Sequence, residues 1–353
     1  MSIDSQPADD AFDVRPATAD DGDELAALYA NSPDTGDIGM APRFKIDPYV
    51  AYTEIDPATD THGIVAETRD GDLAGAGFVS FTDARVGGEI RPMAYLVGLA
   101  VHEEYRGRGL GKRLAAERVQ YAEDHRGDDC VVFAQIQTGN EPSKAVAETW
   151  ADGFPYQTVM VPMQPLDEAP RRDEYTVRPV TDAEHDTVVR ETDEFYADAE
   201  LYAPHTVDEL RQRLAESPIG EPIADYFVVV SEGELVAGAG VINSHKLMWN
   251  KLETLPPELE DADELPPAFP ESREIKPTGI ADLWYAPGHE AAGEALIESI
   301  RAHPDVGNRI GIGIDPDGPV GRIVDTGGQT WDTYIAVRGL EDPMEETFVA
   351  PSI

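Results

Sequence analysis

The stretch Ala94-Tyr-Leu-Val-Gly-Leu-Ala-Val101, followed by His102-Glu-Glu-Tyr-Arg-Gly-Arg-Gly-Leu-Gly-Lys-Arg-Leu114, carries the clearest structural signal in the chain. Its first part is an apolar run of the length expected for a buried strand. Its second part places glycines at positions 107, 109 and 111, where a turn is expected. A helix follows, with Leu114, Val119 and Ala122 on its buried face. The sequence therefore predicts a strand, a glycine-rich turn and a helix in direct succession.

This succession is typical of an anion-binding site. Glycines allow the backbone amides of the turn to converge, and the helix dipole adds roughly half a positive charge at the helix N-terminus. Arg106, Arg108 and Lys112 bring three full charges to the same turn. In a chain with a net charge of −42, this cluster of cations stands out from the acidic background. The turn is therefore expected to bind a phosphate-containing ligand.

Other glycine-rich turns between a strand and a helix have different sequence patterns. Dinucleotide-binding turns have Gly-x-Gly-x-x-Gly, whereas the glycines here alternate as Gly-x-Gly-x-Gly after an arginine. The P-loop pattern is also missing from the sequence. A plain tight connection without a ligand is the remaining alternative, and the clustered cations argue against it.

Length and composition indicate two globular units. At 353 residues the chain exceeds one usual domain, and 41% of its residues are hydrophobic, which is enough for ordinary cores. No apolar run approaches the roughly 20 residues of a membrane span, and the acidic first residues do not resemble a secretory signal. The single cysteine, Cys130, excludes an intramolecular disulfide and is expected to pack in a strand. We therefore expect a cytoplasmic protein with no membrane partner.

The acidic charge is dispersed through both halves of the chain, and lysine is scarce. This pattern is typical of organisms that keep molar salt in the cytoplasm. At about 1 M salt the Debye length is roughly 3 Å, so the self-repulsion of such a surface is screened. We interpret the charge as halophilic adaptation. It also argues against nucleic acid as a partner, because phosphate binding needs a basic surface.

Three short segments recur in the same order along the chain. Residues 12–21 and 175–184 share Val-Arg-Pro-x-Thr, which predicts a strand followed by a capped helix. Residues 70–79 and 232–241 share an acidic-Gly pair between apolar runs, which predicts a hairpin. Val-Gly-Leu-Ala at 97–100 parallels Thr-Gly-Ile-Ala at 278–281. The repeat predicts two tandem domains, 1–166 and 174–353, joined by a linker at 167–173, with a proline-rich insert near 255–270.

The glycine-rich turn resembles the acetyl-CoA motif of the GNAT acyltransferase superfamily, Arg/Gln-x-x-Gly-x-Gly/Ala, met here by Arg106, Gly109 and Gly111. The strand at 130–137 and the Gly153-Phe154 pair also match that family. The resemblance covers residues 12 to about 166. It implies an α/β fold with a mixed sheet, in which two GNAT-like domains follow each other. It also implies acetyl-CoA as co-substrate, an amine as acceptor and no metal.

The resemblance assigns the pyrophosphate of acetyl-CoA to the turn and its pantetheine to the preceding strand. The residues that it implies for cofactor binding are Leu99, Ala100, Val101, Arg106, Gly107, Arg108, Gly109, Leu110, Gly111, Lys112 and Asn140.

The catalytic groups are less evident. Many family members carry a tyrosine four residues before the Gly-Phe pair, but Thr149 stands there in this chain. Tyr156 lies just beyond that pair and is a weak candidate for the general acid, with ordinary packing as the alternative. Glu89 precedes the motif strand and is a weak candidate for the general base. The catalytic residues are therefore unknown at this point.

The second copy is expected to be degenerate. An ungapped alignment of Gly279-Ile-Ala281 with Gly98-Leu-Ala100 places Pro287 opposite Arg106 and Glu290 opposite Gly109. A carboxylate in that place would repel pyrophosphate. We therefore expect the N-terminal domain alone to act, transferring an acetyl group to an amine on a small molecule or a protein. The alternative is a CoA-binding regulatory protein without catalysis.

Overall fold

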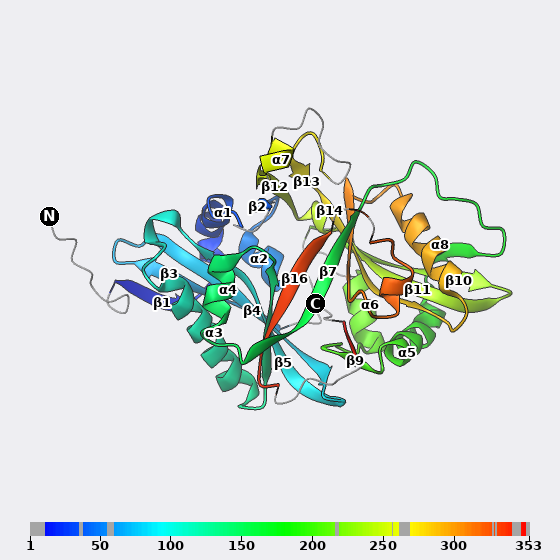
Figure 1. The fold of residues 1–353 in the computed structure, drawn as a ribbon, viewed down its shortest axis with the longest axis horizontal. Helices are drawn as coiled ribbons and strands as arrows, with labels where there is room; N and C mark the ends of the chain where they lie inside the picture. Colours follow the sequence, from blue (N-terminus) through cyan, green and yellow to red (C-terminus); the bar gives the residue numbers. More distant parts are fainter. Residues whose placement is uncertain are drawn as a thin grey trace.

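The computed structural model describes residues 11–34, 38–54, 60–215, 219–255, 257–260, 269–326, 328, 330–340 and 347–350. Its main feature is one 12-stranded sheet with the strand order β1-β3-β4-β5-β6-β16-β7-β15-β14-β11-β10-β8. Neighbouring strands are antiparallel, except that β5 pairs with β6 and β14 with β15 in parallel. The mixed α/β fold predicted from the sequence is confirmed. Figure 1 shows β16 and β7 side by side between the two halves of the molecule.

The elements of the first half follow the order that the repeat predicts. They are β1 (Phe12–Pro16), α1 (Gly22–Ala30), β2 (Gly39–Phe44), α2 (Pro48–Thr53), β3 (Asp60–Thr68), β4 (Leu73–Val86), β5 (Glu89–Val101), α3 (Leu110–Arg126), β6 (Val131–Gln137), α4 (Glu141–Ala147) and β7 (Gly153–Met163).

The second half follows a similar order, with additional short elements before its parallel strand pair and no α-helix between its last two long strands in the described residues. Its elements are β8 (Thr176–Pro179), α5 (His185–Phe195), β9 (Ala199–Glu200), α6 (Val207–Ala215), β10 (Ala224–Ser231), β11 (Glu234–Ile242), β12 (Met248–Thr254), α7 (Pro257–Glu260), β13 (Glu274–Ile275), β14 (Pro277–Tyr285), α8 (Glu290–Arg301), β15 (Arg309–Ile314), β16 (Trp331–Arg338) and β17 (Phe348–Val349).

The two copies of Val-Arg-Pro-x-Thr form the same local structure. In the first copy Arg15 pairs with Asp21 at 2.7 Å, and Asp21 closes a capping box with Thr18. In the second copy Arg178 pairs with Glu184 at 2.6 Å, and Glu184 closes a capping box with Thr181. In each case the carboxylate ties the end of a strand to the beginning of a helix, which explains why the motif recurs.

The two halves share the sheet by exchanging strands. The last long strand of the chain, β16, pairs with β6 on one side and with β7 on the other. Strand β7 of the first half in turn pairs with β15 of the second. Residues 164–175, between β7 and β8, contain no helix or strand. The division of the chain into domains at residues 166 and 174 stays a prediction, but the sheet itself is continuous across it.

A second contact between the halves lies above the sheet in Figure 1. There β12 of the second half pairs with β2 of the first, with Asn250 opposite Pro42 and Leu252 opposite Met40. Strand β13 completes this small sheet. None of the described helices has the length and hydrophobicity that a membrane crossing requires.

Candidate active site

Strands β5 and β6 diverge in the middle of the sheet. They pair only from Met93 to Tyr95 on β5 and from Val131 to Phe133 on β6, although both strands continue further. Beyond Tyr95 they form the walls of an open cavity of about 920 Å³. The cavity reaches from the glycine turn at the beginning of α3 to β2 and β12. A ligand in it can therefore contact the backbone edge of β5 beyond Tyr95, which no strand covers on the β6 side.

A β-bulge shapes β5 inside the cavity. Ala100 pairs with Ala76 and Val97 with Phe78, so one residue more lies on β5 than on β4 between these pairs. Gly98 in the bulge has a φ of +64°, which favours glycine. Its carbonyl accepts a hydrogen bond of 2.6 Å from the Tyr29 hydroxyl of α1. The bulge is therefore held in place by α1.

A buried guanidinium lies behind this bulge. Arg118 of α3 is 3% exposed, and its Nη1 donates to the carbonyls of Phe78 (3.2 Å) and Val97 (3.1 Å). A Cβ at Gly77 would lie 2.9 Å from the guanidinium carbon, so glycine makes room for it. Burial lowers the pKa of Arg118 to about 10, which leaves it charged at neutral pH. Arg118 also lines the cavity and thus gives it a positive potential.

The glycine turn has the backbone conformation of an anion cradle. Gly107 and Gly109 have φ values of +73° and +84°, and Gly109 is the N-cap of α3. The Arg113 amide donates to the Gly109 carbonyl at 3.1 Å, which is the first hydrogen bond of the helix. The backbone amides just before Arg113 therefore have no acceptor within the helix. Apart from the adjoining residues, no described atom lies within 4 Å of a Cβ built on either glycine. The turn therefore presents open space and unpaired helix-start amides to the cavity.

The three cations of this turn have different surroundings. The Arg106 Nε donates to the Val101 carbonyl at 2.9 Å, which ties the turn to the end of β5. The Arg108 guanidinium lies 5.5 Å from the ring centre of Tyr105, and Arg108 is not among the residues that line the cavity. Lys112 is exposed and lines the cavity. Lys112 is thus the cation best placed to meet an anion there.

Asn140 is engaged within the protein. Its Oδ1 accepts a hydrogen bond from the Ser143 amide at 3.1 Å and thereby caps α4. Its Nδ2 donates to the Asp34 carboxylate. The residue lines the cavity, but these bonds give it the task of positioning α4.

The structure brings most of the sequence-predicted cofactor residues to one cavity. All of them except Arg108 line it, namely Leu99, Ala100, Val101, Arg106, Gly107, Gly109, Leu110, Gly111, Lys112 and Asn140.

The two weak catalytic candidates lie elsewhere. Glu89 is exposed at the first position of β5, opposite Val86 in the hairpin and at the far end of the strand from Val101. The Tyr156 hydroxyl is buried and has no hydrogen-bond partner within the part of the chain that the structure describes, and its ring packs in the cluster around Phe133. Burial raises the pKa of Tyr156 further above its usual value. Neither residue lines the cavity, so neither is placed for a reaction at β5, and the catalytic assignment stays a prediction.

Sequence reasoning missed three tyrosines and an asparagine in the cavity wall. Tyr29, Tyr52 and Tyr95 line it from α1, α2 and β5, and Asn250 lines it from β12 of the second half. Burial raises the pKa of Tyr95 to about 12, so its phenol stays protonated at neutral pH. Because these residues are scattered over the chain, only the fold brings them together.

The second half repeats the bulge but not the turn. Gly238 of β11 pairs with Trp284 of β14, and Gly240 pairs with Ala281, so β14 has one residue more than β11 between these pairs. Asp282 is the first residue of this bulge, as Gly98 is in the first half, and it also has a positive φ, of +51°. The ungapped alignment that placed Gly279 opposite Gly98 is therefore wrong by three residues. Residues 102–109 connect β5 to α3, whereas residues 286–289 connect β14 to α8, so this connection is four residues shorter.

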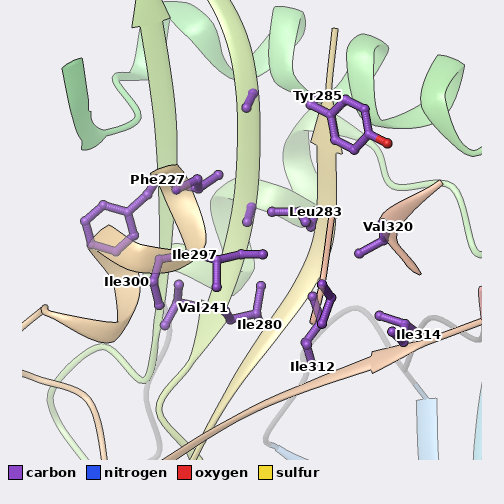
Figure 2. Packing of buried hydrophobic residues seen from close by; sticks show 14 of the residues in the cluster. Phe227, Val241, Ile280, Leu283, Tyr285, Ile297, Ile300, Ile312, Ile314 and Val320 are labelled. Carbon is purple, nitrogen blue, oxygen red and sulfur yellow. The ribbon is translucent and has the colours of Figure 1, made fainter. Parts of the chain in front are cut away.

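Apolar side chains fill the corresponding space of the second half. Figure 2 shows Tyr285, Leu283 and Val320 close together beside Ile312 and Ile314, and all five belong to one buried cluster. The Tyr285 hydroxyl donates to the Pro319 carbonyl at 2.7 Å, which fastens the segment after β15 against β14. Hydrophobic side chains therefore pack beside β14 in the second half.

The comparisons with known proteins agree with this geometry. Residues 33–151, about a third of the chain, match the model of the acetyltransferase (GNAT) family. The crystal structure of a GCN5-related N-acetyltransferase from Sphaerobacter thermophilus is similar over 95% of this chain and 98% of that one, with a TM-score of 0.54 and 12% identity. The fold is that of the GNAT acetyltransferases. The GNAT cofactor motif predicted from the sequence coincides with the matched residues and with the cavity.

Two further solved structures have the same fold over nearly the whole chain. Saccharomyces cerevisiae N-myristoyltransferase with bound myristoyl-CoA matches 99% of this chain and 85% of its own, with a TM-score of 0.61 and 10% identity. A GCN5-related N-acetyltransferase from Kribbella flavida matches 93% and 71%, with a TM-score of 0.52 and 13% identity. The comparison with curated protein sequences gave no match. The GNAT fold therefore extends beyond the matched third of the sequence.

Proposed function

We propose that the chain transfers an acetyl group from acetyl-CoA to an amine on a small molecule or a protein. One observation supports this most directly: a single cavity joins the helix-start amides at Gly109 to the β5 bulge at Gly98. The amides and Lys112 would hold the pyrophosphate, and the uncovered edge of β5 at Leu99 and Val101 would pair with pantetheine. Acetyl-CoA would thereby place its thioester near the bulge.

The charges around the bulge suit acyl transfer. When an amine attacks a thioester, negative charge develops on the carbonyl oxygen and then on the departing sulfur. The Arg118 guanidinium lines the cavity and has no carboxylate partner among the described residues, so its positive potential would stabilise that charge. The protonated phenol of Tyr95 lines the same cavity and is our candidate for the proton donor to the thiolate. Positioning of the two substrates would contribute further to the rate.

The acceptor would enter beside the small sheet. Met40 and Pro42 of β2 and Asn250 of β12 line the cavity there, so both halves of the chain contribute to this wall. The second half would then serve acceptor recognition rather than a second reaction. The second half would thus contribute to the reaction without binding a cofactor of its own.

One observation favours the alternative of a catalytically silent CoA-binding protein. Among the described residues that line the cavity, Asp34 is the one carboxylate, and it accepts a hydrogen bond from Asn140. A general base for the amine is therefore not evident in the wall. An acceptor amine that enters the cavity in its neutral form would need no general base.

Turnover distinguishes the two functions. The full chain, in about 2 M KCl to screen its charge, should release free thiol from acetyl-CoA when a panel of amines, amino acids and N-terminal peptides is offered. Propionyl- and myristoyl-CoA in parallel would define the acyl group. CoA binding without thiol release for every acceptor and acyl group would instead favour the silent protein.

We expect one CoA per chain. The second half has a shorter turn before α8 and hydrophobic packing beside β14, so we expect it to hold no CoA. Calorimetric titration of the full chain with CoA should therefore reach saturation at a molar ratio of one. A ratio of two, or CoA bound at Gly288 in a crystal structure, would contradict this expectation.

A further inference from the structure

A cluster of metal-ligating side chains lies at the other end of α3 from the glycine turn. It consists of Asp60 at the first position of β3, His62 two residues later and His125 in the last turn of α3. The helix has 17 residues, which at about 1.5 Å per residue separates the cluster from the turn by roughly 25 Å. None of the three residues lines the cavity, so the cluster is independent of the proposed acyl transfer.

The three side chains bring one ligand atom each into a small space. His62 Nε2 lies 2.8 Å from Asp60 Oδ1, and His125 Nε2 lies 3.1 Å from Asp60 Oδ2. All three ligand atoms lie within 4.8 Å of one another. A tetrahedral ion with bonds of about 2.0–2.1 Å keeps its ligand atoms about 3.3 Å apart, so the side chains would adjust to that spacing when they bind one.

A simple hydrogen-bonded cluster explains the contact of His125 but not that of His62. The bond between His125 and Asp60 has ordinary geometry. His62 Nε2, by contrast, is buried and has no hydrogen-bond partner in the described part of the chain, although a carboxylate oxygen lies 2.8 Å away. That oxygen must lie off the direction of a ring N–H. Ligands of a shared ion have this relation, because each one points to the ion and not to its neighbours.

Aromatic packing holds the two imidazoles in place. Tyr121, one turn before His125 on α3, stacks on the His125 ring at 5.7 Å and contacts the His62 ring at 5.3 Å. Phe81 of β4 contacts the His125 ring at 4.7 Å. The ligands are therefore preorganised from two different elements. The helix C-terminus adds a partial negative charge that favours a cation.

We propose that Asp60, His62 and His125 bind one divalent transition-metal ion of the Zn²⁺ class, with water completing the coordination. Two imidazoles and one carboxylate are the donors that such ions prefer, whereas Mg²⁺ and Ca²⁺ prefer oxygen alone. The ion fastens the end of α3 to β3 and thereby the helix that begins at the anion cradle.

Cobalt(II) tests this proposal because its visible absorption reports four-coordinate binding. The full chain, freed of metal with a chelator and kept in about 2 M KCl to weaken binding by scattered carboxylates, is titrated with Co²⁺. We expect an intense visible band that saturates at one equivalent and disappears when Zn²⁺ is added. His62→Ala and His125→Ala should weaken binding at least about a hundredfold, since changes outside the ligand set already cost 10–100-fold.

His289→Ala is the matched control. His289 lies before α8 in the second half and makes no side-chain cap bond there. This variant should titrate like the wild type, and circular dichroism should show that all variants are folded. A weak, octahedral-type Co²⁺ spectrum for the wild type would overturn the proposal. So would a band of full intensity in His62→Ala or His125→Ala.

Discussion

Replacement of Gly109 by glutamate is expected to abolish CoA binding, with a loss of affinity of more than about a hundredfold. Gly109 has a φ of +84° at the N-cap of α3, and a side chain in this region costs about 1–3 kcal/mol of strain. The new carboxylate would also occupy the open space before the helix-start amides and repel the pyrophosphate. Each charge-assisted hydrogen bond lost costs about 1.5–3 kcal/mol more, or roughly ten- to a hundredfold. Calorimetry with CoA at matched high salt measures the effect.

Gly288→Glu provides a matched control in the same chain. Gly288 has a φ of +79°, and a Cβ built on it meets no atom within 4 Å in the described structure beyond the adjoining residues. The variant thus carries the same strain and the same added charge at the corresponding turn of the second half. We expect its CoA affinity to equal that of the wild type, with melting curves as the folding control. A folded Gly109→Glu protein that binds CoA normally would show that the cradle is assigned wrongly.

Local sequence was sufficient to predict the first-half turn and the two capped helix starts. Gly107 and Gly109 have left-handed backbones next to a helix start, and such positions are visible as glycines in the sequence. The capping carboxylates Asp21 and Glu184 recur for a similarly local reason, since each bonds an arginine and a threonine within six residues. The fold class follows from these local patterns.

Contacts between distant parts of the chain could not be predicted in this way. No local pattern marks Arg118 in the helix sequence, and its insertion behind the bulge depends on Gly77 lying opposite. Asn250 reaches the cavity only because β12 pairs with β2 across the two halves. The alignment of the second copy with the first was wrong for two reasons. The turn of the second copy is four residues shorter, so no ungapped alignment can match both its strand and its helix. The alignment also followed the short Gly-x-Ala match, whereas the β-bulge marks the true equivalence. Halophilic adaptation stays a prediction.

The first half is expected not to fold on its own, although the repeat suggests a self-contained unit. In the full chain β16 lies between β6 and β7, and its residues Ile335, Ala336 and Val337 are at most 1% exposed. A fragment of residues 1–166 lacks this strand. Its β6 and β7 would present unpaired, apolar edges to water, which favours aggregation.

The energy involved is comparable to the stability of a whole domain. Burial of one Val or Ile side chain contributes about 1.5–3 kcal/mol, so Ile335 and Val337 alone account for several kcal/mol, against about 5–15 kcal/mol for an average domain. We therefore expect fragment 1–166 to be insoluble or to melt without a cooperative transition, and to bind no CoA. Co-expression with residues 167–353 should restore a complex that binds one CoA, because the second fragment supplies β16. A soluble fragment 1–166 that melts cooperatively and binds CoA like the full chain would show that the shared strand is dispensable for the cradle.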